Sequence, residues 1–307
     1  MSCINTRITK ENGFINPFNK TEKYIDIPLF YHVPKNAGTY FISIIILFLR
    51  LFRRERTDWL KLEHETIKNI EIFEKNKSIG RVIVADPHNT IGSKFKTKDV
   101  NKVYYPLRLN KINEGILENI FIFALIIEPD GFIYQQKVID LFSFEKFNFE
   151  KCIILRPPFE RARSFYNYIV DDMSEHEWTH GLITGDNFEE YLKSGYVEDS
   201  WVIRNLCGIG DTVPIEEYHL DKANSLLINF KAVDIKETNS LLNLIFRRCY
   251  KYEMDQIPKE WSVNITRNSS SKKDMIEFSD LDESAQKAFI NRTQFDEQLY
   301  RHNVLCR

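Results

Sequence analysis

The sequence predicts an α/β protein with a central parallel sheet flanked by helices and a helix-rich C-terminal half. Three short apolar runs of strand type, each followed by a turn, support this prediction: Ile25–Val33, Arg81–Ala85 and Lys151–Leu155. Strands that alternate with helices favour a parallel sheet covered on both faces, with ligands bound beyond the carboxyl ends of the strands. The candidate site segments all follow predicted strand ends.

The first strand leads through a turn into an apolar helix. Residues 34–38 supply the turn, and the dense apolar segment from Tyr40 to Phe52 has helical length. Ser43 and Arg50 interrupt this segment, which is also shorter than the about 20 apolar residues that span a bilayer. We therefore expect a buried helix here.

The middle of the chain combines a charged segment, a second strand and a later apolar stretch. Residues 53–77 are charged and compatible with a helix, and the strand Arg81–Ala85 stops at Asp86-Pro87, which places His88 just past a strand end. Residues 92–150 include an apolar stretch at Ile116–Ile127 and the turn Glu128-Pro129-Asp130-Gly131. We expect an insertion or lid in this stretch.

The remainder alternates one strand with helices. After Lys151–Leu155, Pro157-Pro158 opens a helix with an apolar stripe. Five later segments have helical patterns: Phe188–Lys193, Ser200–Leu206, Asp221–Asn229, Glu237–Tyr252 and Asp282–Tyr300. With no internal repeat, we expect a polar tail at residues 1–23 and a single domain over residues 24–307.

Composition limits the possible partners and the compartment. The 42 Lys and Arg against 44 Asp and Glu give a formal charge of −2, so there is no global electrostatic case for nucleic acid binding. The five cysteines are scattered without a CxxC pair and are expected to be free thiols in or near the core. Residues 1–23 lack the apolar stretch of a secretory signal. We expect a cytoplasmic protein with no integral membrane segment; a Golgi location would require an anchor.

The turn after the first strand is a candidate phosphate site. It reads His32-Val33-Pro34-Lys35-Asn36-Ala37-Gly38-Thr39-Tyr40, and its backbone N–H groups precede a helix, where they can converge on an anion. Gly38 permits close approach of the backbone, and Lys35 adds a full positive charge. The turn is not a Walker A loop, because GxxxxGK[ST] is absent and Lys35 precedes the glycine.

The segment PKNAGTY resembles the PKTGGTS loop of sulfotransferases that use 3′-phosphoadenosine-5′-phosphosulfate (PAPS), especially the heparan sulfate 2-O- and 6-O-sulfotransferase branch. The resemblance implies a P-loop-type three-layer fold in which residues 35–40 grip the 5′-phosphosulfate, with Lys35 and Thr39 as the main side-chain contacts. Ala37 replaces a family glycine, which is a mild change. Tyr40 replaces a Ser or Thr, so its backbone amide, and not its side chain, is expected to contribute.

A second candidate phosphate site follows the third strand. That strand ends in Arg156, whose guanidinium fork matches a phosphate, and Ser164 lies about two turns into the next helix. The alternative is that Arg156 pairs with a carboxylate such as Glu160 and that Ser164 is an ordinary helix residue.

The same segment resembles the family signature LRDPxxRxxSxY, which binds the 3′-phosphate of PAPS. Arg156, Arg161, Ser164 and Tyr166 match it in register, whereas Pro157 stands where the family has Asp. A weaker resemblance extends over about residues 27–300. By analogy, the loop at residues 267–273, which begins with Arg267, closes over the nucleotide; a solvated polar loop is the alternative.

The resemblance implies sulfuryl transfer, in which an acceptor hydroxyl attacks sulfur in line and charge develops on the leaving oxygen. Lys35 would neutralise that charge, and His88 is the favoured proton acceptor because an imidazole titrates near neutral pH. Its position resembles the Gly-His step of glycan sulfotransferases, with Pro87 in place of Gly. Rival residues for this role or for substrate contact are Glu63, His64, Glu65, His176 and His180. The chemistry requires PAPS as the donor but no metal.

Two other functions remain open from the sequence. A nucleotide or small-molecule kinase also pairs a phosphate loop with arginines, although the chain has no Walker A loop. A degenerate sulfotransferase fold that binds a nucleotide without turnover is the non-enzymatic alternative, to which Tyr40 and Pro157 lend support. The expected acceptor is a hydroxyl-bearing molecule, with a glycan or glycosylated small molecule favoured.

Overall fold

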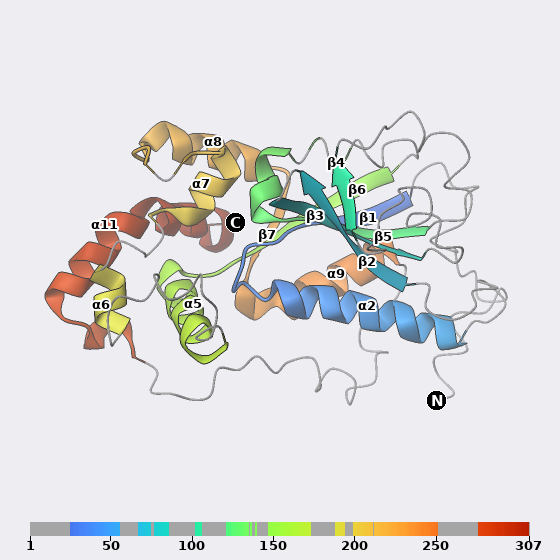
Figure 1. Cartoon of the computed structure of the whole chain (residues 1–307), viewed down its shortest axis with the longest axis horizontal. Coiled ribbons are helices and arrows are strands. Elements are labelled where there is room, and N and C mark those ends of the chain that lie inside the picture. Colours follow the sequence, from blue (N-terminus) through green and yellow to red (C-terminus); the bar gives the residue numbers. More distant parts are fainter. Residues whose placement is uncertain are drawn as a thin grey trace. The chain divides into compact units, whose positions relative to one another are not determined.

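The fold is described from a computed structural model of the 307-residue chain. The structure describes residues 25–55, 67–74, 77–85, 102–105, 121–134, 136, 139, 147–172, 188–193, 199–210, 212–250 and 276–306. The chain divides into two compact units (Figure 1). Unit 1 comprises Met1–His32, Thr39–Ile153 and Lys236–Ile265, and unit 2 comprises Val33–Gly38, Ile154–Ile235 and Thr266–Arg307.

The described residues form an α/β fold around a seven-stranded mixed sheet with the order β4-β2-β3-β5-β1-β6-β7. The strands are β1 (Ile25–Tyr31), β2 (Ile67–Glu74), β3 (Lys77–Ala85), β4 (Lys102–Tyr105), β5 (Phe121–Ile127), β6 (Phe147–Leu155) and β7 (Lys231–Asp234). Strands β5, β1 and β6 are parallel, and Tyr31 lies opposite both Ile127 and Ile153. Strand β3 runs antiparallel to β2 and β5. The α/β class is confirmed, and the predicted central parallel sheet is found in part, because the sheet is mixed.

The antiparallel direction of β3 follows from a strand that the sequence prediction missed. Residues 67–74 were expected in a charged helix, yet Ile70 and Ile72 are buried between more exposed neighbours, with the period of two that strands have. Only residues 75 and 76 separate β2 from β3, and so short a connection requires antiparallel pairing.

The direction of β3 bears on the predicted site. Ala85, its last residue, pairs with Phe121, the first residue of β5, whereas Gly80 pairs with Ile127. Strand β3 therefore ends at the edge of the sheet where β5 and β1 begin. The premise that the segment carrying His88 starts from the same edge as the other two site segments is wrong.

Part of the expected insertion or lid is sheet instead. From the stretch 92–150 the structure describes β4, β5, the start of β6 and the 3₁₀ helix η4 (Pro129–Tyr134). The β5 sequence FIFALII is a continuous apolar run, typical of a strand that is buried on both faces. Its residues 124–127 are completely buried. These residues therefore belong to the core of unit 1.

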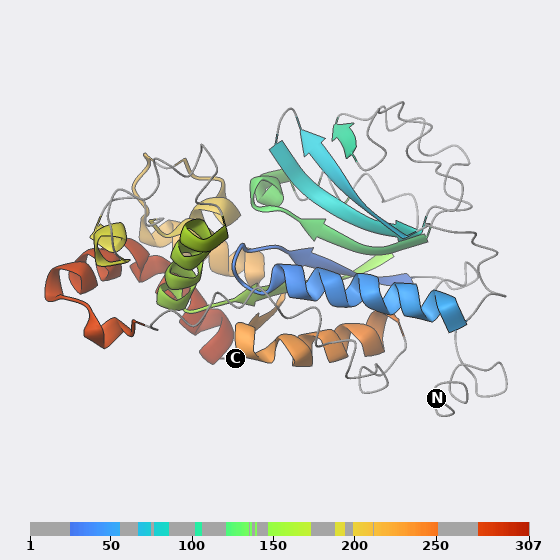
Figure 2. The ribbon, with the colours of Figure 1, turned by 60° about the horizontal axis from the view of Figure 1, so that its bottom comes forward.

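Two helices pack together on the sheet of unit 1: α2 (Gly38–Glu55) and α9 (Thr238–Cys249) (Figure 2). Phe30 of β1 stacks on Phe41 of α2, with ring centroids 4.2 Å apart. Phe48 of α2 meets Phe246 of α9 at 4.6 Å. These contacts make α2 a buried helix, as predicted. Across the described residues, no helix is both long and apolar enough to cross a membrane.

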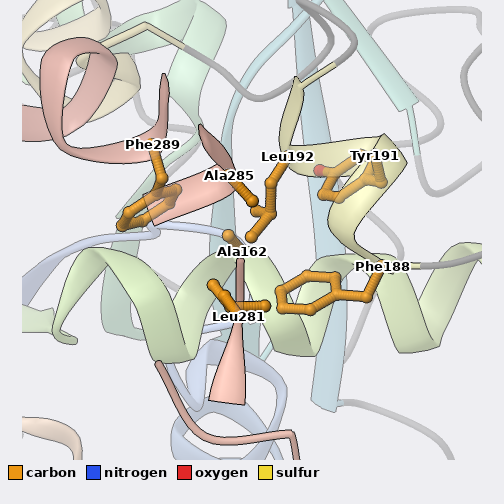
Figure 3. Close-up of a cluster of buried hydrophobic side chains, with 7 residues drawn as sticks. All are labelled: Ala162, Phe188, Tyr191, Leu192, Leu281, Ala285 and Phe289. Carbon is orange, nitrogen blue, oxygen red and sulfur yellow. The ribbon is translucent and has the colours of Figure 1, made fainter. Parts of the chain in front are cut away.

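Unit 2 is mainly helical. Its elements beyond β7 are α5 (Pro158–Asp172), α6 (Phe188–Lys193), α7 (Trp201–Cys207), α8 (Glu217–Leu227), η8 (Phe278–Asp280), α11 (Glu283–Tyr300) and η9 (Arg301–Leu305), while η6 (Ile235–Glu237) spans the boundary with unit 1. The later helices thus match their predicted positions closely. Figure 3 shows one core of this unit, where Ala162 of α5, Leu192 of α6 and Phe289 of α11 meet. This packing fixes α5, the helix that follows the second candidate phosphate site.

Gly131 shapes the turn that follows β5. A Cβ at this position would lie 1.6 Å from the Ile79 carbonyl oxygen, and the Gly131 amide donates to the Glu128 carbonyl at 2.7 Å. We expect Gly131→Ala to lower the free energy of unfolding by about 1–3 kcal/mol, because a methyl group there must displace backbone. Urea unfolding measures the change.

Gly210→Ala is the matched control, because a Cβ there meets no atom within 4 Å. Its free energy of unfolding should stay within about 0.5 kcal/mol of the unmodified protein. Equal losses in the two variants would contradict the close approach at Gly131.

Candidate functional site

The loop between β1 and α2 holds two non-glycine residues in the left-handed region. Lys35 has φ 65° and Ala37 has φ 57°, while Asn36 between them does not have positive φ. This conformation costs an L-residue about 1–2 kcal/mol. Alternation of this kind turns successive N–H groups toward one side, which produces an anion-binding concavity. Helix α2 begins directly after it, at Gly38, with no acidic residue in its first turn.

Two hydrogen bonds within unit 2 hold the loop in this shape. Asn36 is 1% exposed and its Nδ2 donates to the Ile154 carbonyl at 3.0 Å. Arg156 Nη1 donates to the Lys35 carbonyl at 3.2 Å. The end of β6 and Arg156 therefore hold the loop at Lys35 and Asn36, so tertiary contacts maintain the strain.

The Lys35 ammonium group lies against α5. Its Nζ is 4.1 Å from the centroid of the Tyr168 ring, which is a cation–π distance. Tyr168 is four residues after Ser164, and residues at this spacing share one face of a helix. The sequence analysis missed Tyr168, although this spacing was a signal that could have found it.

Arg156 forms the carboxylate pairing that was one of its two expected roles, while its phosphate contact stays a prediction. Its Nε donates to Glu160 Oε2 at 3.4 Å, so the carboxylate pairing exists, but the contact is long. Burial lowers the pKa of Arg156, and the charge of Glu160 opposes this effect. The two hydrogen bonds to Glu160 and Lys35 use two of the five N–H donors of the guanidinium.

A small cavity lies beside the end of β6. Arg156 and Arg161 line it together with Asp296 and Tyr300, and its volume of about 10 Å³ has room for about one water molecule. Asp296 also accepts hydrogen bonds from the Val202 and Ile203 amides, at 3.0 and 3.1 Å. Two guanidinium groups thus lie beside one carboxylate and one phenol hydroxyl at the end of β6.

Tyr300 and Arg161 are held by contacts within unit 2. The Tyr300 hydroxyl donates to Asp234 Oδ2 at 2.6 Å, and burial together with this bond raises the pKa of the hydroxyl, which keeps it protonated. Arg161 is 6% exposed, with its guanidinium 5.0 Å from the Trp201 ring. Arg161 and Tyr300 belonged to segments of the family resemblance, but the interaction of Tyr300 with Asp234 could not be read from either segment.

The remaining predicted residues divide into two groups. Thr39 is exposed, Ser164 is partly buried, and the Tyr40 hydroxyl donates to Asn239 Oδ1 at 2.9 Å, so that side chain is already engaged within unit 1. The predicted base His88 and the predicted loop residue Arg267 lie outside the described residues, as do Glu63, His64, Glu65, His176 and His180.

Comparisons with known proteins give no relative. No protein-family model matches the chain, and no curated protein or solved structure matches it. In the part of the chain that the structure describes, no group of three or more His, Cys, Asp or Glu residues could hold a metal ion. The evidence for a function therefore lies in the two motifs and in the geometry of their residues.

Ala37 provides a test of the loop conformation. We expect Ala37→Gly to raise the free energy of unfolding by about 0.5–1 kcal/mol, because relief of the left-handed strain exceeds the extra chain entropy of glycine. Ala223→Gly in α8 is the control and should lower the same quantity by about 1 kcal/mol or more. A loss of stability in both variants would show that Ala37 is not strained.

Proposed function

We propose that the chain is a sulfotransferase that transfers the sulfuryl group of PAPS to an acceptor hydroxyl, with a carbohydrate as the favoured acceptor class. The proposal includes a P-loop-type three-layer fold. One observation carries it: Arg156 donates to the carbonyl of Lys35, a residue 121 positions away. The two motifs that resemble the 5′-phosphosulfate loop and the 3′-phosphate segment are thus in direct contact, as a site for one nucleotide with two anionic groups requires.

The loop conformation also supports the proposal. The family pattern has glycine where this chain has Ala37, and Ala37 adopts a left-handed φ of 57° that glycine adopts without strain. The substitution is therefore less mild than the sequence indicated. An L-residue that keeps this conformation against its cost supports a functional demand on the loop.

In the proposed site the loop binds the phosphosulfate through the backbone amides of residues 37–40, with Thr39 as a hydroxyl donor. The Asn36 amide is not included, because it donates to the Val33 carbonyl at 3.2 Å. Lys35 neutralises the charge that develops on the leaving phosphate oxygen. Arg156 and Ser164 bind the 3′-phosphate, and Arg267 adds a donor from the loop at residues 267–273. The reaction also requires a proton acceptor, for which the sequence offers His88.

Lys35 tests the chemical role of the loop. We expect Lys35→Ala to lower kcat by about 10²–10³-fold, the usual effect of removing a preorganised charge-stabilising donor. The assay follows transfer of radiolabelled sulfate from PAPS to a panel of sugar acceptors. Lys287→Ala changes an exposed lysine on α11 and should keep full activity. Unchanged turnover in Lys35→Ala would remove the assigned role.

Variants of Arg156 test the proposed contact with the 3′-phosphate. We expect Arg156→Ala to weaken binding of adenosine 3′,5′-bisphosphate by about 2 kcal/mol, roughly 30-fold, through loss of a charge-assisted pair. Binding of adenosine 5′-monophosphate should fall less, because that ligand lacks the 3′-phosphate and loses only the support that Arg156 gives to the loop. Arg156 also donates to the Lys35 carbonyl, so Arg156→Ala removes both a positive charge and a loop contact. Arg156→Lys, which keeps the positive charge, is therefore measured by calorimetry beside Arg156→Ala. If both variants lose affinity equally for the two nucleotides, Arg156 has only a structural role.

A further inference from the structure

Three charged or titratable side chains meet inside unit 1 near the end of β1. Glu128 directly follows β5, His32 directly follows β1, and Arg81 lies on β3. His32 Nδ1 is 2.8 Å from Glu128 Oε2, and Arg81 Nε is 2.5 Å from Glu128 Oε1. The Glu128 side chain is 9% exposed and that of His32 is 14% exposed. The group therefore combines charge with low solvent exposure.

The backbone holds this group in place. Tyr31 pairs with Ile127 at the ends of two parallel strands, and the His32 amide donates to the Ile127 carbonyl at 2.9 Å. The Glu128 amide donates to the Ile79 carbonyl at 3.3 Å. The imidazole and the carboxylate thus project from neighbouring strand ends, the position where open α/β sheets bind ligands.

The electrostatic balance favours an ionised Glu128. Burial raises the pKa of Glu128, whereas the hydrogen bond with His32 and the charge of Arg81 lower it, and the net pKa lies below its ordinary value. An ionised carboxylate accepts from Nδ1–H of a neutral imidazole, which leaves Nε2 as the basic nitrogen. No other described residue forms a hydrogen bond to His32 Nε2.

We propose that His32 is the proton acceptor of the transfer reaction and that Glu128 is its positioning residue; this inference rests on the proposed function. His32 Nε2 takes the proton of the acceptor hydroxyl as that oxygen forms a bond to sulfur. The bond from sulfur to the 5′-phosphate oxygen breaks, and its electron pair leaves with adenosine 3′,5′-bisphosphate. A carboxylate that holds an imidazole in one tautomer is the arrangement of a general base.

Two considerations favour His32 over His88. Three peptide units join His32 to Lys35, so the chain itself keeps their Cα atoms within about 11 Å. The strand before His88 instead ends beside Phe121, at the edge where β5 begins. The length of β5, seven residues at about 3.3 Å each, separates that edge from Ile127 and His32.

The test compares single variants of the full chain in sulfate transfer from radiolabelled PAPS to a panel of aryl glycosides. His32→Asn retains a side-chain donor to Glu128 but lacks Nε2, so we expect kcat to fall about 100-fold or more while the Kd for adenosine 3′,5′-bisphosphate stays within about twofold. Glu128→Gln should lower kcat about 10-fold or more, and Glu128→Asp should restore part of the loss. His302→Asn changes an exposed histidine and should have no effect.

Nitrogen-15 spectra of the histidine side chains give a second measurement that needs no acceptor. We expect the neutral His32 ring to carry its proton on Nδ1 in the unmodified protein and to lose this preference in Glu128→Gln. A ring protonated on Nε2 in the unmodified protein would overturn the inference.

The failures of the two proposals are distinguishable. If His32→Asn keeps the unmodified kcat, or if the loss is confined to His88→Asn, the inference fails and the proposed function stands. If the unmodified chain transfers sulfate to no acceptor and does not bind adenosine 3′,5′-bisphosphate, the proposed function fails and the inference falls with it.

Discussion

The candidate site depends on one constraint: the loop at residues 33–38 keeps two L-residues in the left-handed region. The Asn36 side chain and the Arg156 guanidinium hold it there, because each donates a hydrogen bond to a backbone carbonyl, at 3.0 and 3.2 Å. Lys35 has little freedom as a result, since its carbonyl accepts from Arg156 and its ammonium lies over Tyr168. A preorganised lysine beside converging amides stabilises developing charge without reorganisation during the reaction.

The same constraint explains why Arg156 has two roles in the proposed site. Its hydrogen bonds to Glu160 and Lys35 are structural, and a guanidinium has more N–H donors than these two contacts use. An arginine that fixes the first phosphate loop and also contacts the second phosphate would couple the two ends of the nucleotide. Loss of either phosphate would then weaken the binding of the whole ligand, which is a simple basis for selectivity toward a bisphosphate.

Local patterns predicted much of the fold, because strand β1, helix α2, helix α5 and the later helices each depend on nearby residues. The direction of β3 was not predicted, since residues 67–74 resembled a charged helix and the hairpin that reverses the chain was missed. The contact of His32 with Glu128 was also not predicted, because Glu128 lies 96 positions away and only the pairing of strands brings the two residues together. His32 was visible in the loop motif, but its chemistry depends on that distant carboxylate. Sequence spacing alone could not bring these residues together.

Nucleotide selectivity is the property on which the account depends most. Calorimetric titration of the unmodified chain with adenosine 3′,5′-bisphosphate and, separately, with ATP and Mg²⁺ measures it without an acceptor. A site built for PAPS should bind the bisphosphate at least about 10-fold more tightly than ATP, because the second phosphate adds a charge-assisted contact of about 1.5–3 kcal/mol. Equal or tighter binding of ATP would contradict the sulfotransferase account and favour a kinase-like protein.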